Sequence, residues 1–200
     1  MSNDANLSNR REQAVYLQSG DPTKERRLRL PANANGQEDS YWGGQKGQYF
    51  NVPDSTTGRP AGWQLVLTDS VLDVAPYDGA VAYWKDKSKF LVTTAVTNRG
   101  QGAGIFRDSD APQQPTTHNI AVDTIVCIQK KGRVALKYES GTPDATGLFV
   151  IPGASAGTVI ALGAGAAATY PSIGVSAGAI NVPAANYAYT DIDFLTGDTV

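Results

Sequence analysis

The chain has 200 residues, of which 41% are hydrophobic and 18% are charged, and its formal net charge is −2. This length suits a single domain with an adequate core. The small net charge argues against a nucleic-acid coat protein and a polybasic membrane binder, because both need a clustered basic excess. No apolar run approaches the roughly 20 residues of a membrane helix, and the first residues lack the apolar stretch of a signal peptide.

Residues 1–60 contain many turn-forming residues and little periodic apolar sequence, so little of this segment can contribute to a core. A disordered tail is one interpretation. An extended arm that lies on a neighbouring subunit is the other, because the segment is too aromatic for a solvating tail. The arm would contact its partner through Arg10, Arg11, Tyr16, Arg26, Arg27, Arg29, Tyr41, Trp42, Tyr49 and Phe50.

From Trp63 onward the pattern changes to short strands separated by turns, as expected for a second segment over 61–200. An Asp78-Gly79 pair predicts a tight turn. Gly132 is predicted to be the turn of a β-hairpin, since residues 133–138 alternate apolar and polar side chains. Strands are expected over 63–75, 80–84, 89–96, 102–106, 119–129, 133–138, 148–151, 158–162, 172–176 and 185–194.

Strand candidates recur every 8 to 12 residues after Glu139, which is typical of an antiparallel β-sandwich or β-barrel. The expected fold is therefore mainly β, an antiparallel sandwich or barrel with an extended N-terminal arm. No lysine or arginine follows Lys137, and 21 of the 50 residues from Gly141 to Thr190 are glycine or alanine. This composition predicts thin strands and small-residue loops that another protein covers.

Residues able to carry chemistry are few. Cys127 is the only cysteine and is expected to be a small buried hydrophobe in a strand. His118 is the only histidine, and it lies in a proline- and threonine-rich connection that is a poor support for a general base. Asp191 and Asp193 share one face of a strand and could bind a hard cation, although a solvated outer face with Ile192 and Phe194 turned inward explains them more simply.

Three further motifs are interpreted as loops or turns without a chemical role. Residues 163–168 match a dinucleotide-binding pattern, but nothing around them resembles a βαβ unit, so an inter-strand loop is expected. The string 153–157 is expected to be a small-residue turn and not a nucleophile elbow. The segment 108–110 is expected to be a polar loop tip. We therefore expect no enzymatic activity, cofactor or metal.

The order of four elements resembles the head decoration, or cement, proteins of tailed bacteriophages. These elements are GQGAGIF (100–106), TIVCIQKKGRVALKYESG (124–141), a glycine- and alanine-rich connection leading to SIGVS (172–176), and the final ANYAYTDIDF (185–194). The resemblance covers about residues 80 to 195, and residues 1–60 depart from the compact pattern. Each motif is low in information, so the order carries the resemblance.

The resemblance implies a virion protein, assembled in the host cytoplasm, that binds the outer surface of an icosahedral capsid. It would stabilise the capsid by bridging major capsid protein subunits. Such proteins are often trimers or dimers at symmetry axes, so a homo-oligomer is expected, with no direct contact to nucleic acid or membrane. The alternative is a glycan-binding fibre or adhesin module of a phage, in which exposed aromatic rings stack on sugars.

Overall fold

The computed structural model describes residues 47–53, 59–70, 72–107, 125–179 and 186–194, and these residues are mainly β, as expected. The short 3-10 helices η3 (Lys87–Lys89) and η4 (Val96–Asn98) lie among the strands. The strands are β1 (Tyr49–Pro53), β2 (Pro60–Thr68), β3 (Val81–Asp86), β4 (Leu91–Thr93), β5 (Gly102–Phe106), β6 (Ile125–Lys137), β7 (Phe149–Pro152), β8 (Val159–Ala161), β9 (Gly174–Ala179) and β10 (Tyr187–Asp193).

The strands form one sheet in the order β1-β2-β4-β3-β5-β6-β10-β9-β7-β8. An additional pairing between β2 and β6 closes β2, β4, β3, β5 and β6 into a ring, which is a small barrel. The pairing of β2 with β4 is parallel, so the sheet is mixed and departs there from the antiparallel expectation. Along the chain β3 comes between β2 and β4, but in the sheet β3 lies on the far side of β4. Because β2 and β4 are not joined by a hairpin, they can run in the same direction.

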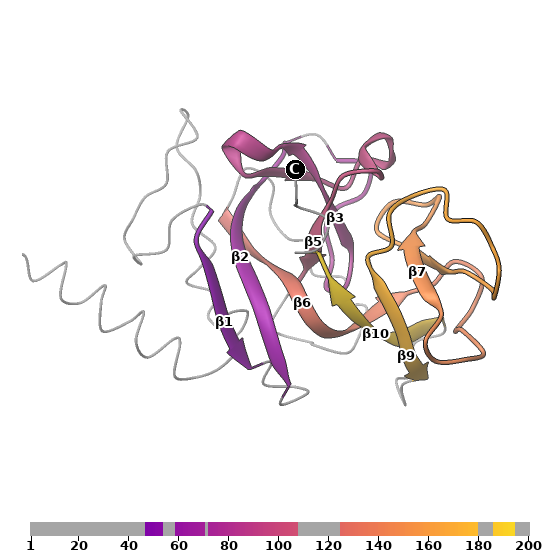
Figure 1. The fold of residues 1–200 in the computed structure, drawn as a ribbon. Helices are drawn as coiled ribbons and strands as arrows, with labels where there is room; N and C mark the ends of the chain where they lie inside the picture. The colour runs from indigo at the N-terminus through magenta and orange to yellow at the C-terminus, as the bar shows by residue number, and fades with distance from the viewer. Residues whose placement is uncertain (1–46, 54–58, 71, 108–124, 180–185, 195–200) are drawn as a thin grey trace, which may run out of the picture.

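The 13-residue strand β6 belongs to both halves of the molecule (Figure 1). Its first half pairs with β2, from Ile125 opposite Leu67 to Lys131 opposite Gly62. Its second half pairs with β10, from Lys131 opposite Asp193 to Lys137 opposite Tyr187. Beyond β10 the sheet continues through β9 and β7 to β8, where Val159 forms an isolated bridge to Tyr138.

The hairpin predicted at Gly132 is therefore wrong. Gly132 does have a positive φ of 113°, but the chain continues through it as one bent strand. A Cβ at this position would lie 2.9 Å from the carbonyl oxygen of Pro60 and 3.2 Å from the Cα of Ala61. The glycine is needed because β2 passes close to the bend, which is a common reason for glycine within a strand. Local sequence does not distinguish this requirement from a turn.

The cores on the two sides of β3 explain why its first four residues, Val81 to Trp84, have no solvated face. Val81 and Tyr83 contribute to a cluster that extends into β6, β7 and β10, whereas Ala82 and Trp84 contribute to a second cluster with β2 and β4. All four side chains are at most 3% exposed. Cys127 is also buried, as predicted, in a third small cluster around Trp63.

A buried polar network connects the turn before β3 to the end of β5 and to β6. Asp78 and Gly79 form the predicted turn, in which Gly79 has a φ of 89°. Arg107 donates from Nε to Oδ1 of Asp78 over 3.0 Å, and a second guanidinium nitrogen donates to the Gln129 side-chain oxygen. The guanidinium also lies 5.8 Å from the centre of the Trp63 ring. Asp78, Arg107 and Gln129 are all buried.

Gln129 extends this network to the bend in β6. Its amide nitrogen donates to the backbone carbonyls of Lys131, over 3.2 Å, and Arg133, over 3.3 Å. These two residues flank Gly132. The bend is therefore stabilised by a side chain that is itself fixed by Arg107.

Replacing Gly132 with alanine is expected to destabilise the protein by more than about 2 kcal/mol, because left-handed strain adds to overlap with the Pro60 carbonyl. Gly141→Ala is the matched control: its φ is 93°, but the nearest atom lies 4.0 Å from the added Cβ, so only strain of about 1 kcal/mol applies. Urea unfolding measures both variants. Equal losses of stability would contradict the close approach at Gly132.

Candidate partner-binding surface

Of the residues predicted to contact a partner, Tyr49 and Phe50 lie in β1 of the described structure. Residues 1–46 lie outside it, so the structure does not place Arg10, Arg11, Tyr16, Arg26, Arg27, Arg29, Tyr41 and Trp42. β1 is the first strand in the sheet order, and within the described ranges its outer edge pairs with no other strand. Part of the segment expected to be an arm is therefore a strand of the sheet.

The Tyr49 side chain is 36% exposed and lies across β2. Its hydroxyl donates to Oδ1 of Asn51 over 3.1 Å, and it occupies the space that a Cβ on Gly62 would need. Partial burial, and then the negative charge of Asp193, raise the pKa of the Tyr49 hydroxyl. Glycine at position 62 thus lets an aromatic side chain of the edge strand rest directly on the barrel.

The most exposed large apolar side chain of the described residues is Phe149, at 62%. It begins β7, where the next residue, Val150, faces the core and is fully buried. Val175 lies opposite Phe149 in β9 and is half-buried on the same face, as is Ile160 of β8. An apolar outer face therefore extends across β9, β7 and β8, at the end of the molecule drawn in orange in Figure 1.

A small-residue loop follows β8 and adjoins this outer face. Residues 163–169 are all exposed, with a turn at Gly165, where φ is 80°. The amide of Leu162, just before the loop, donates to the carbonyl of Phe149 over 2.8 Å. The interpretation of residues 163–168 as an inter-strand loop is confirmed, because no helix begins there whose amides could hold a pyrophosphate.

The carboxylates of β10 lie on the outer face of the sheet, as expected, while Ile192 and Phe194 are buried. Arg133 directly opposes Asp191 in the register and donates to both of its carboxylate oxygens, over 2.8 and 2.7 Å. Asp193 opposes Lys131, with 3.7 Å between its oxygen and the ammonium nitrogen. Each carboxylate is thus paired with a cation of β6.

Glu139 has a structural role in the turn at 153–157, which is the small-residue turn predicted from the sequence. Its carboxylate accepts from the hydroxyl of Thr158 over 2.6 Å and from the amide of Ser155. Partial burial favours the neutral acid, but these hydrogen bonds outweigh it and lower the pKa of Glu139. The carboxylate therefore fixes a turn and is not free for acid–base chemistry.

The described part of the chain offers no grouping of three or more histidine, cysteine, aspartate or glutamate side chains suited to a metal ion. None of its helices has the length and apolar character needed to cross a membrane. His118 and the segment 108–110 lie outside the described residues.

The exposed phenyl ring at position 149 was not identified from the sequence. Residues 148–151 are Leu, Phe, Val and Ile, so a continuous apolar run replaces the alternation that would separate an outer face from an inner face. The one available signal was the general absence of cations after Lys137, which marks a segment and not a side chain.

Comparison with solved structures gives a weak structural similarity. The chain matches no known family profile and no curated protein. A solved structure described as the capsid of Myoviridae phage XM1 aligns with a TM-score of 0.46 and 14% identity, over 74% of this chain and 89% of that chain. Similarity of this extent does not assign a function.

The pair between Asp191 and Arg133 predicts a pH-dependent contribution to stability. The hydrogen bonds from Arg133 outweigh partial burial and lower the pKa of Asp191, so its stabilisation is present above the ordinary pKa of about 4 and is lost as pH falls through the lower folded-state value. Because both side chains are partly exposed, Asp191→Asn should cost no more than about 1 kcal/mol at pH 7.

This cost should shrink as the pH is lowered from 5 to 2. Urea unfolding of the wild type and Asp191→Asn across that range measures it. Asp144→Asn, at an exposed position, controls for the general loss of one negative charge. If the two variants give the same pH profile, the cross-strand pair contributes nothing.

Proposed function

We propose that the chain is a structural virion protein that binds the outside of an icosahedral phage capsid and stabilises it by bridging major capsid protein subunits. The observation that carries the proposal is the apolar outer face centred on Phe149, in a part of the chain without lysine or arginine. The order of elements that resembles phage decoration proteins supports the same function. The proposed activity is non-enzymatic.

The energetics of this face suit many weak contacts on a repeating surface. Fully burying a phenyl side chain contributes about 1.5–3 kcal/mol, and Phe149 is 62% exposed before any partner binds. One such contact is too weak for stable attachment. Joined to further contacts on the same copy, or repeated in a homo-oligomer, it yields high avidity without any single strong site.

Charge supports the proposal that a protein covers this face. Cations near the centre of a protein interface carry a desolvation cost, and charged residues are depleted there. The face contains Phe149, Val175 and Ile160, followed by the exposed loop 163–169. A partner could therefore approach closely without burying an unpaired charge.

The main alternative remains a glycan-binding module of a phage fibre or adhesin. A sugar needs an accessible aromatic face. The ring of Tyr170 already has the guanidinium of Arg99 4.8 Å from its centre, so the exposed ring of Phe149 is the better candidate for stacking on a sugar. Selective binding of the isolated protein on a glycan array, together with no binding to capsid shells, would favour it over the capsid function.

Replacing Phe149 with serine should weaken binding to empty capsid shells of the phage that encodes the chain by at least about tenfold, because a loss of about 1.4 kcal/mol corresponds to that factor. Co-sedimentation with the shells measures binding. Phe149→Leu is the matched control, since it retains an apolar side chain and most of the affinity. Both variants should unfold at the wild-type temperature, because the ring is largely exposed. Unchanged binding by Phe149→Ser would contradict the role of this face.

Removing residues 1–46 should leave a folded protein that binds the same shells poorly, because the proposed arm residues before β1 are then absent. The truncation retains β1 and its pairing with β2. Circular dichroism reports the fold, and light scattering with and without shells reports self-association and binding. Full binding by the truncated protein would overturn the arm proposal, while the proposal for the Phe149 face would stand.

A further inference from the structure

One long edge of β1 has no neighbouring strand in the described part of the chain. β1 pairs with β2 along its five residues, and Figure 1 shows it in indigo beside β2, at the end of the sheet. Tyr49 and Asn51 are exposed on this strand. An edge of this kind presents a row of amide and carbonyl groups with which another strand can pair.

The direction of these backbone groups follows from a hydrogen bond next to the strand. The amide of Leu65 donates to the carbonyl of Gln48 over 3.0 Å, so the backbone carbonyl of Gln48 faces β2. Tyr49, the next residue, lies opposite Gln64 in the same register. Because the backbone groups of an antiparallel strand alternate between its two sides, those of Tyr49 face away from β2.

The same alternation turns the backbone of Asn51 and Pro53 outward. The open edge therefore offers the amides of Tyr49 and Asn51 and the carbonyls of all three residues, since proline has no amide hydrogen. The strand Tyr-Phe-Asn-Val-Pro contains no charged residue, and its register with β2 has no bulge. Charges and bulges commonly protect edge strands from pairing, and β1 has neither.

The strand at the other end of the sheet is protected. Val159 of β8 forms a bridge to Tyr138, and its carbonyl accepts from the amide of Glu139 over 3.0 Å. The chain that follows β6 thus covers the outer edge of β8. Among the described residues, β1 is the terminal strand without such cover.

The open edge of β1 is complementary to itself. If a second copy places its β1 antiparallel to the first, with a two-fold axis at Asn51, the two Asn51 residues exchange both backbone hydrogen bonds. The amide of Tyr49 in each copy then donates to the carbonyl of Pro53 in the other. Every outward amide has an acceptor, and Pro53 is needed only as an acceptor.

Two further properties favour this register. It pairs all five residues of each strand, and a shift in either direction shortens the overlap. No like charges meet along the strands, because the segment 49–53 has no charged side chain. Donors therefore face acceptors without an opposing electrostatic cost.

We propose that β1 is a self-association edge, at which two copies of this chain pair antiparallel about Asn51 and join their sheets into one. A five-residue contact is smaller than a standard protein interface, so pairing in solution is weak and depends on concentration. It becomes stronger where other contacts hold copies side by side. The proposal concerns the free protein and does not rest on the capsid function.

The first test places a cysteine at position 51 of the full-length protein. Opposed residues that exchange hydrogen bonds have Cα atoms about 5.5 Å apart, which suits a disulfide. Under oxidation, Asn51→Cys should form a covalent dimer at least about tenfold faster than Asp144→Cys, because pairing raises the effective concentration of the two thiols. Non-reducing electrophoresis measures the rates.

Asp144→Cys is the matched control, since position 144 is exposed and lies between β6 and β7. Cys127 is buried and is common to both variants. Equal rates of dimer formation in the two variants would overturn the proposal.

The second test uses charge at the two-fold axis. Asn51→Lys and Asn51→Asp each place like charges directly opposite one another, so each variant alone should self-associate at least about threefold more weakly than the wild type. An equimolar mixture should recover association, because opposite charges then face each other. Sedimentation equilibrium measures both, and Thr142→Lys, at an exposed position, should associate as the wild type does. A mixture that associates no better than the separate variants would overturn the pairing about Asn51.

Capsid shells distinguish a second copy from another occupant of the edge. Asn51→Pro removes an outward amide and leaves the bonds to β2 intact, as proline at a strand edge can. If the wild type stays monomeric up to its solubility limit, self-pairing is overturned; a loss of shell binding of about tenfold or more in Asn51→Pro would then assign the edge to a strand of the shell. Self-association that Asn51→Pro abolishes, without binding of the wild type to shells, would support the pairing and overturn the capsid function.

Discussion

The buried guanidinium of Arg107 is the constraint on which the described fold most depends. It pairs with Asp78 before β3 and with Gln129 in β6, while it is itself the residue after β5. Removing one partner of a buried ion pair typically costs about 3–5 kcal/mol, a large share of the roughly 5–15 kcal/mol that stabilises a domain. Because Gln129 also donates to the carbonyls on either side of Gly132, the same network supports the bend that carries β6 out of the barrel.

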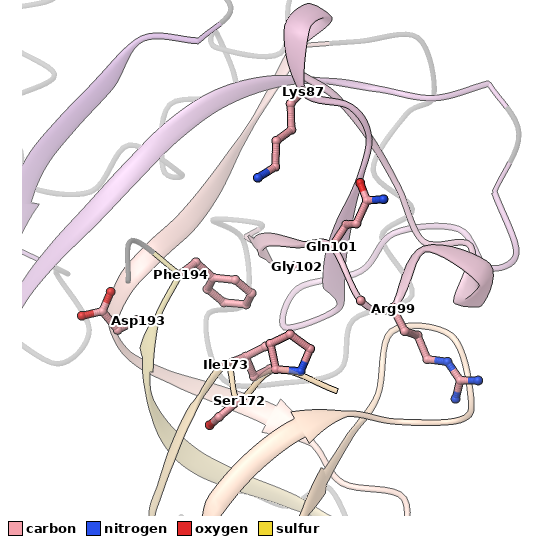
Figure 2. Close-up of a pocket in the computed structure, with 10 residues that line it drawn as sticks. Lys87, Arg99, Gln101, Gly102, Ser172, Ile173, Asp193 and Phe194 are labelled. Carbon is pink, nitrogen blue, oxygen red and sulfur yellow. The ribbon is translucent and has the colours of Figure 1, made fainter. Parts of the chain in front are cut away.

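The bend in β6 decides where the surfaces lie. Before it, β6 completes the barrel with β2 and β5. After it, β6 supports β10, and through β10 the sheet reaches β9, β7 and the outward-facing Phe149. A cavity lined by Lys87, Gly102, Ile173 and Phe194 lies where the two halves meet, since its walls come from both (Figure 2). The Phe149 face and this cavity are thus positioned by a single continuous strand.

The fold class and most strand positions follow from local sequence, because short apolar runs between turn residues restrict the chain to a few structures. The pair Asp78-Gly79 also specified its turn correctly. Gly132 did not, because a positive φ is required both by a hairpin turn and by a bend beside a neighbouring backbone, and only the packing of β2 distinguishes them. Lys87 and Phe194 line the same cavity although 107 positions separate them in the sequence, and no local pattern predicts such an arrangement.

The absence of cations after Lys137 has a physical explanation in the described structure. Arg133 and Lys131, near the end of the cationic part of the chain, are positioned by β6 to neutralise Asp191 and Asp193 of β10. These two carboxylates therefore obtain their counter-charges across the sheet from β6. Its outer face on β9, β7 and β8 can remain apolar, with small-residue loops beside it. A face of this kind is poorly suited to holding charged reactants, but it gives a protein partner a surface that carries little desolvation cost.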